Sequence, residues 1–250
     1  SNGDCPDDYG TSGPNTDRNG CVDNDGDGWS NYGDEFPDEE TQWEDSDQDG
    51  YGDNANGVNG DQCSIAWGDS FEDRYGCPDE DADGWSNPDA NWTASDGADA
   101  FPTIPSQWSD RDGDGWGDNE SDTVTGDACP WDWGASWRDR NGCLDTDNDG
   151  SSDPSGIGTF LEWNESMGAD MWPLDPTQWT DSDGDGYGDN NSLGATDPDM
   201  FPDNIAAAVD NDSDGYPDQW TSFYDLSDED MTNNGAGLEL DGCPGVWGNS

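Results

Sequence analysis

The stretch TQWTDSDGDGYGDN, residues 177–190, carries a pattern that recurs throughout this chain. From Asp181 onward it places aspartate at positions 1, 3, 5 and 9 of a loop, and Gly186 stands at the sixth position. Calcium loops have this ligand spacing, with side-chain oxygens at positions 1, 3 and 5 and a backbone carbonyl at position 7. The sixth position requires a turn that glycine adopts most easily. The stretch therefore predicts a calcium site.

The same pattern occurs seven times, in loops that begin at Asp23, Asp45, Asp79, Asp110, Asp145, Asp181 and Asp210. An aromatic residue stands at position 7 in six of the seven loops. Position 9 is aspartate in five loops and asparagine in two, Asn31 and Asn87. A degenerate eighth copy begins at Asp228. The alternative is an acidic low-complexity segment, which is usually disordered, but random acid enrichment would not keep this register.

The predicted metal ligands are side-chain oxygens, except at position 7, where the backbone carbonyl is the ligand. Loop by loop they are Asp23, Asp25, Asp27, Trp29 and Asp34; Asp45, Asp47, Asp49, Tyr51 and Asp53; Asp79, Asp81, Asp83 and Trp85; Asp110, Asp112, Asp114, Trp116 and Asp118; Asp145, Asp147, Asp149, Ser151 and Asp153; Asp181, Asp183, Asp185, Tyr187 and Asp189; and Asp210, Asp212, Asp214, Tyr216 and Asp218.

These loops are not EF-hands, because position 12 is a carboxylate only at Asp34 and no amphipathic helices flank the loops. The remaining oxygens must come from the backbone, from water or from acids elsewhere in the repeat. Such open coordination predicts weak sites, about 10⁻⁴–10⁻³ M, and fits calcium better than magnesium, which demands near-ideal octahedral geometry.

The composition makes metal a part of the fold. Only 28% of the 250 residues are hydrophobic, and 62 acids against five bases leave a net charge of −57. Such a chain cannot bury enough apolar surface to offset its conformational entropy. Seven calcium ions would bring the charge to −43, and their binding energy becomes folding energy. We expect mostly irregular, calcium- and disulfide-stabilised tandem repeats with little helix or strand, forming an elongated rod. Short helical turns are expected at 159–166 and 204–209, with one or two short strand pairings.

Cysteines define a second repeat, GDCPDDYGTSGPNTDRNGC (3–21), GDQCSIAWGDSFEDRYGC (60–77) and GDACPWDWGASWRDRNGC (126–143). The natural pairs are Cys5–Cys21, Cys63–Cys77 and Cys129–Cys143, each closing a loop worth roughly 3 kcal/mol in the chain-entropy model. Zinc is a poorer alternative, because the chain has no CxxC motif and no histidine. Disulfides indicate an oxidising, extracellular setting. Cys243 begins a fourth copy, so either the chain continues or Cys243 pairs with another subunit.

The repeats suggest four segments: an N-terminal cysteine loop (1–21), repeat 1 (22–77), repeat 2 (78–143) and a longer repeat 3 (144–250). In each repeat a first-type loop (beginning at Asp23, Asp79 or Asp145) follows a Gly-Cys pair. A second-type loop (beginning at Asp45, Asp110 or Asp181) follows Thr/Ser-Gln-Trp.

Arg18, Arg74 and Arg140 each follow an aspartate and precede x-Gly-Cys. Their expected role is to tie carboxylates across the disulfide loop through the guanidinium fork, and the alternative is ligand recognition.

Fifteen tryptophans are many for so polar a chain. Those in register with the loops are expected in small cores beside the ions. The irregular ones are candidates for a contact surface: Trp92, Trp131, Trp133, Trp163 and Trp172. Five Asn-x-Ser/Thr sequences occur, and Asn91 and Asn164 are the candidate glycosylation sites, since the others adjoin metal loops.

The DxDxDGxxD loops joined by DRxGC segments resemble thrombospondin type 3 repeats, and resemble more closely the tandem calcium repeats of microbial surface and secreted proteins. The resemblance covers nearly the whole chain. It implies calcium ligands at positions 1, 3 and 5 of each loop, little regular secondary structure, and a role as stalk, spacer or adhesive segment.

Three functions compete. The first is an extracellular structural protein, a calcium-stiffened rod or filament subunit. The second is a calcium-dependent adhesin or carbohydrate-binding segment. An enzyme is the third and is not expected, because the acids are committed to metal and the chain has no histidine, lysine or nucleophile motif. The charge excludes nucleic acid and anionic membranes as partners, and no apolar run could insert into a membrane. Self-association through the Cys243 end and glycans remain as possible partners.

Overall fold

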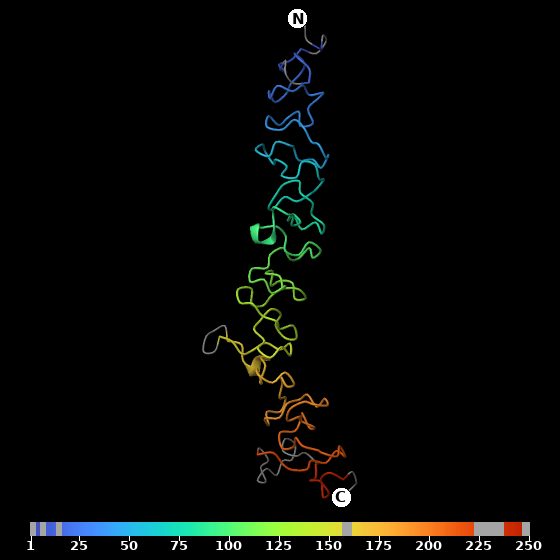
Figure 1. Cartoon of the computed structure of the whole chain (residues 1–250), viewed down its shortest axis with the longest axis vertical. Coiled ribbons are helices and arrows are strands. Elements are labelled where there is room, and N and C mark those ends of the chain that lie inside the picture. Colours follow the sequence, from blue (N-terminus) through green and yellow to red (C-terminus); the bar gives the residue numbers. More distant parts are fainter. Residues whose placement is uncertain (1–3, 6–8, 14–16, 157–161, 223–237, 247–250) are drawn as a thin grey trace. The chain divides into compact units, whose positions relative to one another are not determined.

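The computed structural model of the chain describes residues 4–5, 9–13, 17–156, 162–222 and 238–246. Within this part, regular secondary structure is limited to two 3₁₀ turns, η1 (Ala94–Asp96) and η2 (Glu165–Met167), and to isolated β-bridges. Figure 1 shows the other described residues as irregular loops. The prediction of a mostly irregular, disulfide-stabilised fold is confirmed.

The chain divides into two compact units. The first comprises residues 1–111 and 117–126, and the second comprises residues 112–116 and 127–250. Each unit contains candidate metal loops of both types, so both loop types can be described within either unit.

The expected helical turns are only partly found. η2 ends just beyond the predicted segment 159–166, whose first residues lie outside the described part. The predicted turn of helix at 204–209 is wrong: a non-helical turn there leads into a bridge between Ala207 and Trp220. Pairing with the segment at Trp220 replaces helical hydrogen bonding here, because the Thr221 N–H donates to the Ala206 carbonyl at 2.9 Å.

η1 and η2 belong to one inserted motif, Trp-x-x-Ser-x-Gly-Ala-Asp, at residues 92–99 and 163–170. Each turn ends at a glycine with a left-handed backbone, and the alanine and aspartate that follow are buried. The insertion therefore delivers a buried aspartate, Asp99 or Asp170, into the body of its repeat.

The interior is polar. The largest fully buried side chains include Gln42, Gln107 and Gln178, together with the aspartates Asp61, Asp99, Asp127, Asp170 and Asp199. The buried apolar residues are small, mainly cysteine and alanine with Pro217. The tryptophans in register with the loops are only half-buried, although Trp85 and Trp108 do stack with ring planes 6° apart. Buried polar groups are tolerated only when they are hydrogen-bonded or bound to metal.

All three predicted disulfides are present, and the described Cys243 is unpaired and exposed. A buried serine braces each cysteine loop from within. Ser70 Oγ donates to the Arg74 carbonyl at 2.5 Å and accepts the Cys77 N–H at 3.0 Å. Ser12 and Ser136 make the same contacts in the other two loops.

The arginines of these loops contact aromatic rings, and the ion pairs among the described residues include none between such an arginine and a carboxylate of its own disulfide loop. Arg18 lies over Tyr32, Arg74 over Trp92 and Arg140 over Trp163, with guanidinium carbons 4.1, 5.5 and 5.2 Å from the ring centroids. Arg74 does form an ion pair, but its partner Asp89 lies beyond the disulfide loop, 2.7 Å away. The structural role predicted for these residues therefore takes a different form, cation–π packing.

No helix in the described ranges is long and apolar enough to cross a membrane.

Candidate metal centres

The first aspartate of each loop shapes the turn. Asp45 accepts the backbone N–H of Gln48 on one carboxylate oxygen, at 2.7 Å, and that of Gly50 on the other, at 2.9 Å. Asp79, Asp145, Asp181 and Asp210 repeat this pair of contacts to positions 4 and 6. Position 1 is thus a structural residue as well as a possible ligand.

The turn requires left-handed backbone at two positions. The glycine at position 6 has φ between 92° and 107° in every loop, as the sequence predicted. Position 4 is also left-handed, and there the residue need not be glycine: Gln48, Ala82, Asn148 and Ser213 have φ between 60° and 66°. Residues other than glycine are strained in this region. The hydrogen bonds that the position 1 carboxylate accepts therefore stabilise a backbone conformation that the residue at position 4 would otherwise disfavour.

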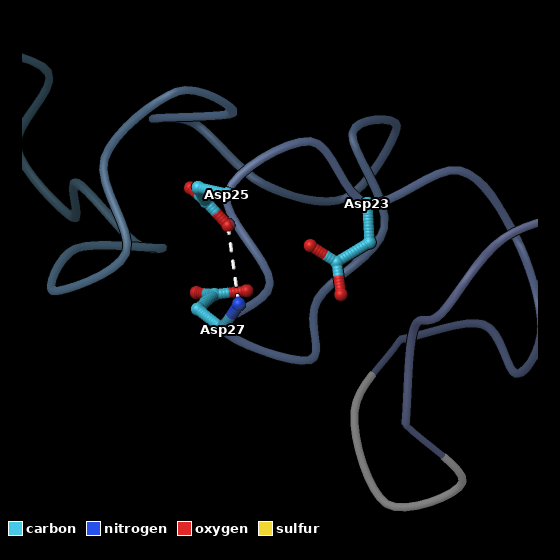
Figure 2. Close-up of side chains that lie close together, drawn as sticks. All are labelled: Asp23, Asp25 and Asp27. Carbon is cyan, nitrogen blue, oxygen red and sulfur yellow. Dashed lines mark hydrogen bonds between the residues drawn. The ribbon is translucent and has the colours of Figure 1, made fainter.

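Except for Asp47 and Asp212, the aspartates at positions 3 and 5 each use one oxygen for the backbone. In the first loop, Asp25 Oδ1 accepts the Asp27 N–H at 3.2 Å, and Asp27 Oδ1 accepts the Trp29 N–H at 2.7 Å. Figure 2 shows the three carboxylates of this loop around one space. Ligand oxygens of Asp23, Asp25 and Asp27 lie within 4.8 Å of one another, as do those of the loops beginning at Asp45, Asp79 and Asp145.

The other oxygens at positions 3 and 5 are buried without a hydrogen-bond donor. In the described part this holds for Oδ2 of Asp25, Asp27, Asp81, Asp83, Asp147, Asp183, Asp185 and Asp214, and for both oxygens of Asp47 and Asp212. Burying an unpaired carboxylate oxygen costs several kcal/mol unless a cation neutralises it. The donor set is all oxygen and anionic, so the residues present fit a hard divalent cation.

Burial, and then repulsion from neighbouring carboxylates, raises the pKa of several of these acids. Burial, together with the other acids of the same loop, raises the pKa of Asp83 and of Asp185 to about 6. The neutral form is favoured because two or three negative charges share one small, partly desolvated volume. A bound cation would reverse this preference.

A further buried aspartate, which we call the closing aspartate, accompanies each loop. The closing aspartates of the seven loops, in chain order, are Asp34, Asp61, Asp99, Asp127, Asp170, Asp199 and Asp241. Each accepts the N–H of the residue two positions later on Oδ1, at 2.6–2.7 Å. For Asp61, Asp99, Asp170, Asp199 and Asp241 the second oxygen is buried and accepts no hydrogen bond within the described residues.

Electrostatics link these aspartates to their loops. Burial, with smaller contributions from the three carboxylates of the loop at Asp79, raises the pKa of Asp99 to about 6. Burial likewise raises the pKa of Asp170 and of Asp199 to about 7, with contributions from the loops at Asp145 and Asp181. Each closing aspartate thus adds another carboxylate oxygen to an acidic loop.

Of the closing aspartates, the sequence analysis predicted only Asp34 as a metal ligand. It expected acids elsewhere in the repeat to complete the other ligand sets, but did not identify them. A signal was present: four of the closing aspartates begin Asp-x-Phe/Trp-Pro, and the other three precede a cysteine by two residues. Because their distance from the loop varies, from 11 residues for Asp34 to 31 for Asp241, a fixed loop template does not find them.

The residue at position 9 closes the loop on itself. Asp53 accepts the Ser46 N–H at 3.0 Å and the Ser46 hydroxyl at 2.5 Å, and Asp189 does the same with Ser182. Asn31 and Asn87 accept the equivalent N–H through their amide oxygens. This backbone cap explains why asparagine can replace aspartate at position 9. Metal ligation by Asp53, Asp118, Asp153, Asp189 and Asp218 stays a prediction.

Position 8 distinguishes the two loop types. In first-type loops it is serine, and the aspartate of the preceding DRxGC segment accepts both its N–H and its hydroxyl; the pairs are Asp17–Ser30, Asp73–Ser86 and Asp139–Ser152. In second-type loops it is glycine, because the buried glutamine of Thr/Ser-Gln-Trp lies there. A Cβ on Gly188 would lie 1.9 Å from Gln178 Oε1.

Each complete cysteine loop of repeats 1 and 2 therefore joins two metal loops. In the second cysteine loop, the Gly68 N–H donates to Asp49 of the preceding second-type loop at 3.2 Å, while Asp73 binds the following first-type loop. In the third, Gly134 and Asp139 make the corresponding contacts to Asp114 and Ser152.

The loop that begins at Asp110 crosses the boundary between the two units, with Asp110 in the first and Asp112 and Asp114 in the second. The degenerate copy at Asp228 lies outside the described residues.

The irregular tryptophans separate into two groups. Trp92 packs against Arg74 and donates its indole N–H to Asp73 at 2.9 Å, and Trp163 packs against Arg140, so assigning these two to a contact surface was wrong. Trp131 and Trp133 are 72% and 59% exposed, and Trp172 is half-buried.

The candidate glycosylation sites also differ. Asn91 is exposed, whereas Asn164 is half-buried and its amide donates to Glu162 at 3.0 Å. The side-chain amides of Asn119 and Asn190, in two of the other sequences, donate to backbone carbonyls.

Comparison of the sequence with protein-family models and with curated proteins finds no match. The geometry itself defines the class: a disulfide-stabilised chain of repeated acidic loops, several of whose aspartate triplets could bind metal ions.

Proposed function

We propose that this chain is an extracellular structural protein whose repeats fold around calcium ions. The observation that carries the proposal is the set of buried carboxylate oxygens without donors, which gather at positions 3 and 5 and at the closing aspartates. A fold with this interior needs cations to offset the repulsion, so ion binding and folding are one process.

Calcium fits this donor set better than other common metals. Position 1, position 3, position 5, the position 7 carbonyl and the closing aspartate offer oxygens only, whereas zinc and copper favour sulfur and nitrogen. Calcium accepts six to eight oxygens in flexible geometry, while magnesium requires a strict octahedron and retains its water. The disulfides support an oxidising location outside the cell.

The resemblance to thrombospondin type 3 repeats supports the role of a stiff spacer, rod or filament subunit. The second and third cysteine loops each contact the acidic loops that precede and follow them in sequence, and contacts between sequence neighbours are how tandem repeats build extended structures.

The test is a calcium titration of the full chain, followed by circular dichroism and sedimentation velocity, with EDTA reversal and magnesium as control. We expect binding of about seven ions and an ordered chain that is less expanded than the metal-free one at millimolar calcium. A chain that stays expanded at millimolar calcium would refute the proposal. Electron micrographs of the calcium form then test the rod or filament: compact globular particles would exclude it.

A further inference from the structure

The cysteine loops display aromatic side chains to solvent at one recurring position. The fourth residue after the first cysteine is Tyr9, Trp67 or Trp133, and their side chains are 71%, 59% and 59% exposed. Large aromatic side chains held in water are costly and commonly mark contact sites. These residues are not needed for the ion loops or for the polar interior described above.

At Trp133 the exposed ring borders a hollow of about 420 Å³. Leu144 and Pro154 contribute apolar surface, Asp132 and Ser155 contribute polar groups, and the Cys129–Cys143 disulfide lies beside them. All of these residues belong to the second unit. A hollow of this size, mainly apolar with a few polar groups, is in the range that binds small ligands.

The walls of the hollow are fixed by the neighbouring first-type loop. Leu144 directly precedes Asp145, and its carbonyl accepts the N–H of Asp153, which is position 9, at 2.7 Å. Both oxygens of Asp153 are occupied by Thr146. Ser155 is held by two backbone hydrogen bonds to Trp163, each 2.8 Å long. The site is therefore preorganised, which lowers the entropic cost of binding.

The chemistry of the hollow selects a class of ligand. Its lining contains the carboxylates Asp132 and Asp153 and no basic residue, and the whole chain carries −57, so anionic ligands are repelled. An indole ring presents a flat apolar face that can cover the C–H face of a sugar ring. Of the two carboxylates, the exposed Asp132 can accept hydrogen bonds from sugar hydroxyls.

We propose that the hollow beside Trp133 is a binding site for an uncharged pyranose ring of a glycan. Trp133 stacks on the ring, Leu144 and Pro154 cover its edge, and Asp132 accepts its hydroxyls. The site adds a recognition function to the scaffold. This inference rests on the proposed function only in that the loop at Asp145, whose fold depends on calcium, forms one wall of the hollow.

The experiment uses the full chain at about 5 mM calcium, above the range expected for the loops. Saturation-transfer NMR titrations measure binding of methyl β-glucoside, cellotetraose, tetra-N-acetylchitotetraose and, as a cationic probe, glucosamine tetramer. For one small site we expect a Kd on the order of 10⁻³ M, with the tetramers binding more tightly than the monosaccharide.

Three variants locate the site. Trp133→Ala should weaken binding about fivefold or more, the loss of one stacking contact, and Trp133→Phe should restore most of it. Asp132→Asn should weaken binding without affecting the ring contact. The matched control is Trp67→Ala, because Trp67 is equally exposed at the same position of the second cysteine loop and does not line the hollow.

Calcium stoichiometry and near-ultraviolet circular dichroism of each variant are measured in parallel, so that a failure of the scaffold is distinguished from a failure of the sugar site. The proposal is overturned if no uncharged sugar binds to the calcium-loaded chain, or if Trp133→Ala and Asp132→Asn bind as well as the wild type. It is also overturned if only the glucosamine tetramer binds and about 0.5 M salt abolishes it, which would indicate general attraction to an acidic surface.

Discussion

Gln178 and the backbone of Asn190 form a reciprocal pair of hydrogen bonds. The Gln178 side-chain amide donates to the Asn190 carbonyl at 3.0 Å, and the Asn190 N–H donates to Gln178 Oε1 at 3.1 Å. Asn190 directly follows position 9 of the loop that begins at Asp181. The glutamine thus anchors the end of a metal loop to the segment before it, and Gln42 and Gln107 do the same for their loops.

Gln178→Ala should destabilise the calcium-loaded chain by about 2–3 kcal/mol, because it removes the hydrogen-bond partners of the N–H and carbonyl of the half-buried Asn190. Urea unfolding at fixed calcium measures the effect. Gln219→Ala is the control, since Gln219 is exposed, and it should change stability by less than about 0.5 kcal/mol. Equal midpoints for the two variants would show that the buried pair does not hold the loop.

Asp199→Asn should weaken calcium binding at one site. The substitution neutralises a fully buried carboxylate that faces the acids of the loop at Asp181. We expect about 10–100-fold weaker binding at one site, with the other sites unchanged. Calorimetric titration is the measurement, and the exposed neighbour Asp203 supplies the control variant, Asp203→Asn. If all sites keep their affinity, the closing aspartates are not ligands.

Ala82→Gly should change the free energy of unfolding by between zero and about +1 kcal/mol, so the variant is at least as stable as the wild type. Ala82 has φ of 64°, a conformation in which alanine is strained and glycine is not. The matched substitution Ala90→Gly, at an exposed residue whose φ is not positive, should destabilise by roughly 0.5–1 kcal/mol through the entropy of the unfolded chain. Thermal unfolding at fixed calcium compares them, and a larger loss at Ala82 than at Ala90 would contradict the strained turn.

Calcium affinity should fall as pH falls below 7. In the absence of metal, burial raises the pKa of Asp170 and Asp199 to about 7, so each carries a proton below that pH that calcium must displace. Each displaced proton lowers apparent affinity about tenfold per pH unit below the raised pKa.

The stability of the metal-free fold should depend on pH in the opposite direction. A carboxyl with a raised folded-state pKa stabilises the fold when protonated and loses this contribution as pH rises through 7. The metal-free chain should therefore be more compact at pH 5 than at pH 8, while the calcium form behaves the other way. Titrations and sedimentation at both pH values check this, and a calcium affinity independent of pH would contradict it.

Local features were predictable from the sequence, whereas contacts between segments were not. The glycines at position 6 and the three disulfides follow from spacing within one loop. Asp61 and Asp99 were missed because their distances from their loops differ. The buried position of Gln107 was not predicted, because the sequence Ser-Gln-Trp gives no sign that its side-chain amide hydrogen-bonds to the backbone of Asn119, twelve residues later. Trp92 was misplaced because its partner Arg74 lies in the preceding cysteine loop.

The polar interior has a consequence for the denatured chain. When an ordinary domain melts, it releases apolar surface that sticks to other molecules. Here the groups released are glutamine, serine and aspartate, which water solvates well, and the charge of −57 keeps separate chains apart. Withdrawing and restoring the cation should therefore cycle the protein between two soluble forms, with aggregation playing little part.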